Sequence, residues 1–152
     1  TQNDGILKTN TLNKIENSKQ FNCITLWGVL EHLNDPLKFC KYLLKFLKKG
    51  GFILLEVPNA DSILMKYLSI NPSKQNRYIE PGRHLFFFSK NFFNIISKKF
   101  RLKLIDYETN GLDFQTLLGP QNYKISKQIF KIQNIIDKMD ISDHSRVVLQ
   151  KR

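Results

Sequence analysis

Two stretches of this chain are almost entirely apolar, and the residues between them have the hydrophobic spacing of a helix. The first stretch is FNCITLWGVL, residues 21–30, and the second is FILLEV, residues 52–57. A continuous apolar run of this length indicates a β-strand that is covered on both faces, as in a parallel sheet. A shorter strand is predicted at residues 6–12, ILKTNTL.

The segment between the two apolar runs is predicted to form a helix that begins at Pro36. Asp35 can accept a hydrogen bond from a free backbone N–H, and Pro36 suits the first helical position because its missing N–H costs nothing there. We expect Gly50 and Gly51 to end the helix. Its apolar side is expected to consist of Leu37, Cys40, Leu43, Leu44 and Leu47. A strand, a helix and a strand in this order form a βαβ unit, so the two strands should pair in parallel.

The second half of the chain is less regular. Residues 100–109, FRLKLIDYET, and residues 145–151, SRVVLQK, have the pattern of strands. Ser89 is the expected N-cap of a helix, and Phe88 is expected to pack on Phe93 across its first turn. A helical insertion is expected near residues 112–141, either packed on the sheet or lying on a membrane surface. The apolar face of this insertion would consist of Ile125, Ile129, Ile132, Ile136 and Met139.

The length of 152 residues fits a single domain, residues 1–152, but the formal net charge of +11 needs an explanation. Most of the excess is lysine, and several lysines recur at helical spacing, as on a solvated helix surface. These are Lys38, Lys41, Lys45 and Lys48. No arginine-rich patch interleaved with aromatic residues accompanies the charge, so we expect no specific nucleic-acid binding.

Other classes of protein are disfavoured by what the sequence lacks. No apolar run reaches the roughly 18 residues of a membrane span, and the opening TQNDGILK lacks the layout of a secretory signal, so we expect a cytoplasmic protein. Cys23 and Cys40 are expected to be reduced thiols in the core. No metal-ligand spacing, GxSxG motif or GxxxxGK[ST] loop is present, so the motifs predict no metal site.

Each of the two apolar runs ends in polar residues. Glu31 and His32 end the first run, and the segment 58–61, PNAD, ends the second. The carboxyl ends of parallel strands meet at one rim of an open sheet, and ligands bind there. Glu31 and His32 are therefore candidate site residues. Their ordinary alternatives are a carboxylate bonded to nearby backbone amides and a histidine that caps a loop.

The segment FNCITLWGVLEHLNDPLKFCKYLLKFLKKGGFILLEVPN resembles the centre of class I S-adenosylmethionine-dependent methyltransferases. It is most similar to the branch that includes ubiquinone-biosynthesis O-methyltransferases, whose pattern is FDxIxxxxVLEHLxDPxxxLxxxxxxLKPGGxLxxxxPN. Residues 82–96, GRHLFFFSKNFFNII, resemble a later element of these enzymes. Asn22 and Lys49 depart from the pattern at positions that are chiefly structural in the family. The resemblance implies an α/β fold of the Rossmann-like methyltransferase type.

The resemblance also implies that the domain is partial. The family's glycine-rich DxGxGxG-like loop, which lets the backbone approach the cofactor, has no counterpart among the glycines of this chain. We therefore expect the latter strands of a mostly parallel sheet, from a truncated methyltransferase domain whose S-adenosylmethionine site is incomplete in this chain. The implied cofactor-binding residues are Asn10 and Thr11 near the adenine, and Trp27 and Gly28 near the methionine part. The alternative for Trp27 is an ordinary core tryptophan.

The resemblance further implies that Glu31 and His32 border the reaction centre. A histidine near its unperturbed pKa suits the removal of a proton from a hydroxyl, and His32 and His84 are the candidates for this role. The alternative for His84 is a histidine that is satisfied at the start of a strand. Asn59 and Arg83 are candidates for binding the acceptor.

The function expected from these observations is methyl transfer to a small-molecule acceptor at a hydroxyl. Two other classes of function are alternatives. The domain could be a non-catalytic scaffold, or a basic module that binds an anionic partner.

Overall fold

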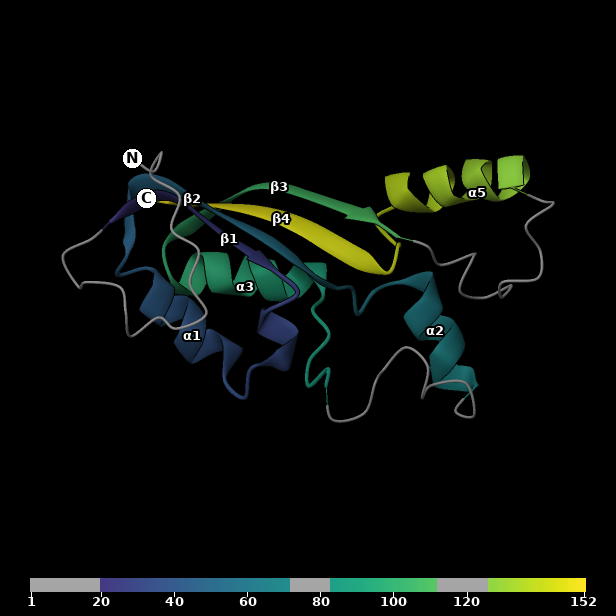
Figure 1. Ribbon diagram of the computed structural model, residues 1–152, viewed down its shortest axis with the longest axis horizontal. Helices are drawn as coiled ribbons and strands as arrows, with labels where there is room; N and C mark the ends of the chain where they lie inside the picture. Colours follow the sequence, from purple (N-terminus) through teal and green to yellow (C-terminus); the bar gives the residue numbers. More distant parts are fainter. Residues whose placement is uncertain (1–19, 72–82, 112–125) are drawn as a thin grey trace, which may run out of the picture.

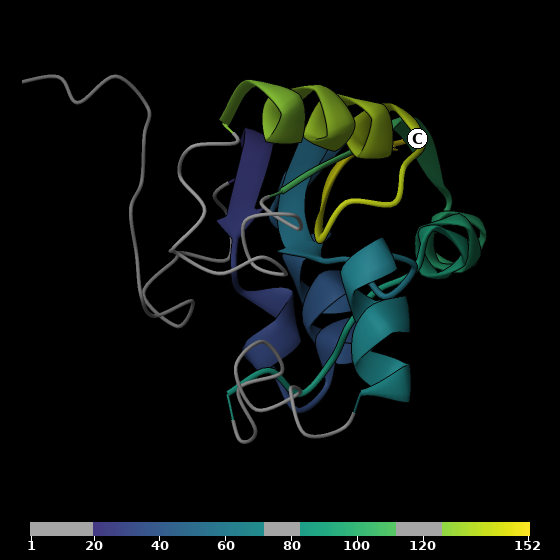
Figure 2. The same cartoon turned by 90° about the vertical axis from the view of Figure 1, so that its right-hand side faces the viewer.

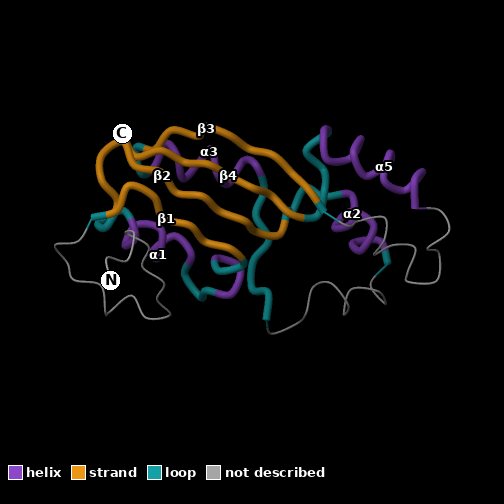
Figure 3. Tube along the Cα trace, turned by 45° about the horizontal axis from the view of Figure 1, so that its top comes forward, coloured by secondary structure: helices purple, strands orange, loops and turns teal. Residues whose placement is uncertain are grey.

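The computed structural model describes residues 20–71, 83–111 and 126–152, and these residues form a four-stranded sheet with helices around it. The strands are β1 (Phe21–Trp27), β2 (Leu47–Pro58), β3 (Leu102–Asn110) and β4 (His144–Lys151). Their order in the sheet is β1-β2-β4-β3 (Figure 3). The helices are α1 (Pro36–Leu43), α2 (Ile63–Ile70), α3 (Lys90–Lys99) and α5 (Ser126–Lys138), and a short 3₁₀ turn, η2, spans Leu30–His32.

The predicted parallel pairing of the two apolar runs is confirmed. β1 and β2 run parallel, with Ile24 opposite Ile53 and Trp27 opposite Glu56. β4 is antiparallel to both β2 and β3. His144, the first residue of β4, pairs with the last residue of β2 and with the last residue of β3. The start of β4 and the end of β3 therefore lie at the rim that carries the carboxyl ends of β1 and β2. The mixed sheet confirms the α/β fold class.

The hydrophobic core lies on one face of the sheet. Helices α1 and α3 lie on the same side of it (Figure 1), whereas α5 lies on the opposite side of the molecule from α1 and α2 (Figure 2). The core includes Leu26, Leu30, Leu43, Leu55, Phe93, Val147 and Leu149. The expectation that the first apolar run is covered on both faces is wrong, because Cys23, Thr25 and Trp27 on the other face of β1 are exposed. That face has no helix of the α1–α3 layer against it.

The two cysteines are free thiols in the structure, as predicted, but only one lies in the core. Cys40 on α1 is buried, and burial raises the pKa of its thiol to about 11. Cys23 is exposed because it lies on the open face of β1, so the prediction of two core thiols is wrong for this residue.

The helix after β1 begins as predicted but ends earlier. The side chain of Asp35 accepts a hydrogen bond from the N–H of Lys38 at 2.8 Å, and Pro36 is the first helical residue. The helix ends at Leu43, and the glycines expected to end it lie within β2 instead. Gly51 is needed there because of close backbone approach: a Cβ on it would lie 2.9 Å from the backbone oxygens of Lys48 in β2 and of Asn22 in β1.

Later elements agree with the predictions in part. Ser89 caps α3 by accepting a hydrogen bond from the N–H of Phe92 at 3.2 Å, and the rings of Phe88 and Phe93 lie 6.3 Å apart. In α5, Ile136 is buried as expected for the apolar face, but the prediction is wrong for Ile132 and Met139, which are exposed. No helix in the described ranges is long and apolar enough to cross a membrane. The predicted strand at 6–12, together with residues 112–125 of the expected insertion, lies outside the described residues.

Candidate functional site

A tight turn after β1 presents the first candidate residues. Gly28 has φ of +61°, in the left-handed region that favours glycine, and its N–H donates a hydrogen bond to the backbone oxygen of Glu56 at 3.1 Å. This turn ends the strand one residue after Trp27 and leads into η2. Leu30, which is fully buried, anchors η2 in the core and thereby fixes the two residues that follow it.

Backbone hydrogen bonds bring a distant segment to this turn. The backbone oxygen of Glu31 accepts hydrogen bonds from the N–H groups of Leu85 and Phe86 at 2.7 and 3.3 Å. As a result, the imidazole of His84 lies beside that of His32, with 5.0 Å between the ring centroids. The structure therefore brings together the three predicted catalytic residues, although 52 positions separate His32 from His84.

Glu31, His32 and His84 form a cluster in which two buried polar atoms have no hydrogen-bond partner among the described residues. One potential ligand atom from each side chain lies within 4.8 Å of the others. His32 Nδ1 lies 2.6 Å from the backbone oxygen of Arg83, and its Nε2 lies 3.8 Å from Glu31 Oε1. Glu31 Oε2 and His84 Nδ1 are buried without a hydrogen-bond partner among the described residues.

This arrangement suits a ligand. Buried polar groups in proteins are nearly always hydrogen-bonded, so two unpaired atoms in one cluster indicate a missing partner. A carboxylate and two imidazoles are also donors that bind divalent transition metals. Motif spacing along the sequence could not have revealed this cluster, because its side chains come from two segments that only the fold brings together.

Trp27 and Gly28 lie beside this cluster at the end of β1. The side chain of Trp27 is 53% exposed on the open face of the sheet, so the alternative of an ordinary core tryptophan is wrong. Its neighbour across the sheet is Glu56, which forms an ion pair of 2.8 Å with Arg146 of β4. The other two predicted cofactor residues, Asn10 and Thr11, lie outside the described residues.

Asn59 lies at the same rim but differs from the cluster in that its side chain is fully buried and bonded. Its amide nitrogen donates to the backbone oxygen of Ser142 at 2.8 Å, and its amide oxygen accepts from the N–H of Asp61 at 2.9 Å. These bonds hold the end of β2 against the segment before β4. Substrate binding by Asn59 stays a prediction, and the side chain has no open face in this structure.

A third histidine, which the sequence did not single out, also lies at this rim. Nδ1 of His144 lies 3.0 Å from Oδ1 of the buried Asp143. This hydrogen bond raises the pKa of the imidazole above its usual value, and the charges of Glu56 and Glu31 act in the same direction, although burial opposes them. The short sequence DHS at the start of a strand carries no motif that would have identified the pair.

A basic hollow lies at the opposite end of the sheet from these residues. Its volume is about 570 Å³, and it is lined by five cationic side chains and no acidic one. These cations are Lys49, Lys98, Arg101, Lys103 and Arg152. The hollow is the structural counterpart of the basic-module alternative and shares no residue with the cluster.

Comparison with known proteins points to one enzyme class. A family model described as a methyltransferase domain matches residues 3–106. Over 55 residues the chain is 36% identical to a protein of Dictyostelium discoideum named "Ubiquinone biosynthesis O-methyltransferase, mitochondrial". That match covers 36% of this chain and 16% of the relative.

Solved structures with a similar fold are also methyltransferases. An S-adenosylmethionine-dependent methyltransferase of Thermotoga maritima aligns with a TM-score of 0.57 at 13% identity, and one of Archaeoglobus fulgidus with 0.52 at 15%. A plantazolicin methyltransferase in complex with SAH aligns with a TM-score of 0.52 at 17% identity. The alignment with the Thermotoga protein covers 88% of this chain and 57% of that structure, and the alignment with the Archaeoglobus protein covers 88% and 60%. The alignment with the plantazolicin methyltransferase covers 92% of this chain and 55% of that structure. The chain thus spans little more than half the length of these structures, and the likeness shows the fold.

Proposed function

The chain belongs to the methyltransferase-domain family, and from this premise we propose that the protein transfers the methyl group of S-adenosylmethionine to a hydroxyl of a small-molecule acceptor. The observation that carries the proposal is the Glu31–His32–His84 cluster with its unpaired polar atoms. It lies at the carboxyl end of β1, the rim at which open α/β sheets bind ligands.

The cofactor would bind next to Trp27 and Gly28. An exposed indole face attracts a cation, and the sulfonium of S-adenosylmethionine is one. The left-handed turn at Gly28 keeps the backbone free of a side chain at the point where β1 ends. Asn10 and Thr11 remain predicted contacts of the adenine.

The chemistry demands little from the protein, because the sulfonium already activates the methyl group. The site must hold the acceptor oxygen in line with the methyl carbon and receive the hydroxyl proton. A lone pair of the oxygen forms the new C–O bond, and the pair of the broken S–C bond stays on sulfur. We assign the cluster to the acceptor oxygen, with His32 and His84 as candidate proton acceptors and Arg83, whose backbone positions His32, as a candidate contact.

The same three side chains would hold a divalent cation if one is required. Such a cation lowers the pKa of a bound hydroxyl and so favours its deprotonation. Glu31 would supply the negative charge and the two imidazoles the neutral donors.

The name of the Dictyostelium relative supports an oxygen acceptor, since that protein is an O-methyltransferase. The matched segment is short, so the acceptor is part of the proposal. Neither a scaffold domain nor a basic module is favoured by the comparisons, although a scaffold of this fold would match them equally.

The test is binding of S-adenosylmethionine and formation of SAH by the natural protein. Calorimetry should show S-adenosylmethionine binding that weakens at least tenfold in Trp27→Ala, which corresponds to about 1.4 kcal/mol. Phe52→Ala is the matched control, because Phe52 is a partly exposed aromatic residue on the same sheet face, opposite Cys23 in the middle of β2, and it should leave binding unchanged.

The catalytic arm uses S-adenosylmethionine and catechol as a probe acceptor, with SAH measured by mass spectrometry. The isolated 152-residue chain should bind the cofactor weakly, because it lacks the glycine-rich loop. Absence of both S-adenosylmethionine binding and turnover in the natural protein would overturn the proposal in favour of the scaffold. Binding that Trp27→Ala leaves intact would remove only the assignment of that tryptophan.

A further inference from the structure

We propose that His144 is a further catalytic residue of this methyl transfer: in place of His32 or His84, it receives the proton of the acceptor hydroxyl on Nε2, while Asp143 holds its ring. The inference rests on the proposed function and deepens it. It concerns the histidine that neither the sequence motifs nor the comparisons single out.

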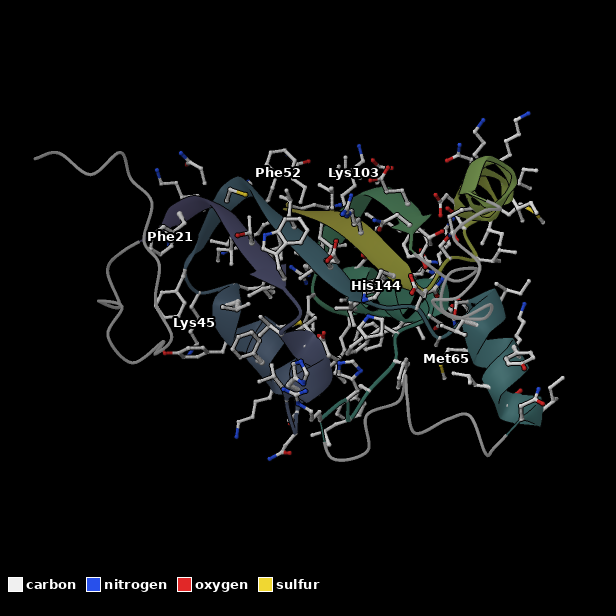
Figure 4. The ribbon with its side chains drawn as sticks, turned by 45° about the vertical axis from the view of Figure 1, so that its right-hand side comes forward. Phe21, Lys45, Phe52, Met65, Lys103 and His144 are labelled. Atoms are coloured by element: carbon white, nitrogen blue, oxygen red, sulfur yellow. The ribbon has the colours of Figure 1, made fainter. Side chains whose placement is uncertain are left out.

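His144 occupies a suitable place at the rim. It is the first residue of β4, and it pairs with Pro58 at the end of β2 and with Asn110 at the end of β3 (Figure 4). β4 lies two strands from β1, which at the usual strand spacing is about 10 Å. An acceptor held between the Trp27 end of β1 and the start of β4 would therefore lie within reach of both.

His144 also lies on the face of the sheet that Trp27 occupies. Side chains alternate along a strand, and in β4 the residues next to His144 and Arg146 in the sequence are buried in the core. His144 is therefore on the open face with Arg146, whose partner Glu56 lies opposite Trp27. The tryptophan and this histidine therefore lie on the same face of the sheet.

The contacts of Asp143 and His144 are those of a general base with its orienting group. The carboxylate of Asp143 is almost fully buried, and its backbone oxygen accepts a 2.7 Å hydrogen bond from the N–H of Asn59, which fixes the residue in place. Its Oδ1 receives the Nδ1–H of His144 at 3.0 Å. That bond selects the tautomer in which Nε2 carries a lone pair, and Nε2 has no partner in the described part of the chain.

The ring nitrogens of the other two histidines are less available to a bound hydroxyl. In His32, Nδ1 lies 2.6 Å from the backbone oxygen of Arg83 and Nε2 lies 3.8 Å from Glu31 Oε1, although the side chain is 43% exposed. In His84, Nδ1 is buried. His144, whose side chain is 41% exposed, has one ring nitrogen bonded to Asp143 and the other without a partner in the described residues. On the neighbouring strand, Asn110 lies opposite His144, and its buried Oδ1 has no hydrogen-bond partner among the described residues. This oxygen could accept a hydrogen bond from a bound ligand.

The charges around His144 favour its role as a base. Asp143 lies directly before β4, Glu56 acts from β2, and Glu31 acts from η2. The cation nearest along its strand, Arg146, is paired with Glu56. These acids stabilise the imidazolium that forms when the acceptor loses its proton.

The step balances without another reactant. The acceptor O–H proton moves to Nε2, the oxygen lone pair forms the O–CH₃ bond, and the S–CH₃ electron pair remains on the sulfur of SAH. The imidazolium then releases its proton to water and is ready for the next cycle.

The experiment compares His144 variants of the natural protein, with catechol and S-adenosylmethionine as substrates. Loss of a general base typically costs about 10²–10⁴-fold, so we expect kcat to fall at least about 100-fold in His144→Gln with KM within about threefold. His144→Asn should be equally inactive, although its amide can keep the bond to Asp143. Gln150→Ala, on the same face at the far end of β4, is the matched control and should keep the wild-type rate.

The pH profile separates catalysis from a structural role. In the wild type, kcat should rise with pH through a midpoint above the usual histidine value, and Asp143→Asn should move this midpoint down. A wild-type rate in His144→Gln, or a midpoint that Asp143→Asn leaves in place, would overturn the inference. Rescue of His144→Asn to the wild-type rate would also overturn it, because only the hydrogen bond would then matter.

Failure of the proposed function looks different. In that case the wild type itself forms no SAH with catechol as acceptor and does not bind S-adenosylmethionine, and the inference falls with it. If the wild type is active and only the His144 variants are unaffected, the proposed function stands and the inference alone is wrong.

Discussion

Two polar regions share one rim of this sheet, but they differ in how far their hydrogen bonds are satisfied. The cluster of Glu31, His32 and His84 contains a carboxylate oxygen and an imidazole nitrogen that are buried without a partner in the described residues. At the same rim, Asn59 and the segment before β4 form a network in which each polar side chain is hydrogen-bonded. Its other members are Thr109, Gln133, Asp137 and Ser142.

This difference indicates that the network stabilises the fold, whereas the cluster serves function. A saturated network holds the ends of β2, β3 and α5 together and has little capacity left for a ligand. An unsaturated cluster costs the folded protein stability unless a ligand, proton or cation satisfies it. The cluster is therefore expected to tolerate substitution for stability but not for activity, and the network the reverse.

The largest expected effect is loss of stability when the network is broken. Asn59→Leu removes three side-chain hydrogen bonds, of which the one to the backbone oxygen of Asp140 is long at 3.4 Å, and leaves the backbone oxygen of Ser142 and the N–H of Asp61 unpaired. Each unsatisfied buried group costs about 1–3 kcal/mol, so the free energy of unfolding should fall by about 3 kcal/mol. Urea denaturation followed by circular dichroism measures it.

Glu31→Gln is the matched variant in the cluster. It keeps the shape of a buried side chain whose Oε2 has no described partner, so the free energy of unfolding should change by less than about 1 kcal/mol. If Glu31→Gln destabilises the protein as much as Asn59→Leu, the distinction between the two regions is wrong.

The next effect tests the cluster as a cation site. A ligand that binds only the folded state at 100 times its dissociation constant adds about 2.7 kcal/mol. Mn²⁺, Zn²⁺ or Mg²⁺ should raise the melting temperature of the wild type, and EDTA should reverse the shift. The shift should vanish in Glu31→Gln and in His84→Gln, but persist in Asp106→Asn, which changes an exposed carboxylate of β3.

The sequence predicted correctly those structural elements that depend on interactions between neighbouring residues. The apolar runs predicted the parallel pair, and Asp35 with Pro36 predicted the start of α1, because capping acts within one turn. The end of α1 was missed because Gly50 and Gly51 serve β2, where backbone from the neighbouring strand approaches Gly51. No local pattern reports such an approach between two segments.

The candidate site was predictable only in part for the same reason. Glu31 and His32 were found from their position after a strand. The adjacency of His84 depends on backbone bonds between two distant segments, and the Asp143–His144 pair depends on where β4 enters the sheet. The exposure of Trp27 was also missed, since an apolar run does not reveal that one face of its strand is open.

A smaller effect concerns the turn that presents the cluster. Gly28 has φ of +61°, and a Cβ there would lie 3.4 Å from Glu31 Oε1, an ordinary contact. The cost of Gly28→Ala is therefore backbone strain alone, about 1–2 kcal/mol, without a steric clash. Gly28→Asn, which tolerates this conformation better, should recover part of the loss in the free energy of unfolding. Equal stability of all three proteins would show that the turn changes its conformation.

The smallest expected effect lies where the two regions meet, at Asp143 and His144. The hydrogen bond to Asp143 raises the pKa of His144 in the folded state, so the folded protein binds a proton more tightly than the unfolded chain does. The resulting stability is fully present below the unfolded pKa of about 6.5 and is lost as pH rises through the higher folded value. Asp143→Asn should therefore lower the free energy of unfolding more at about pH 5.5 than at about pH 8.5.

Because the imidazole is 41% exposed, solvent screens the pair, and the difference should stay below about 1 kcal/mol. Urea denaturation at both pH values measures it, and His144→Gln supplies the double-mutant cycle, in which the pH-dependent part of the Asp143→Asn effect should disappear. A destabilisation that is independent of pH, or that survives in the His144→Gln background, would place Asp143 wholly within the structural network beside Asn59.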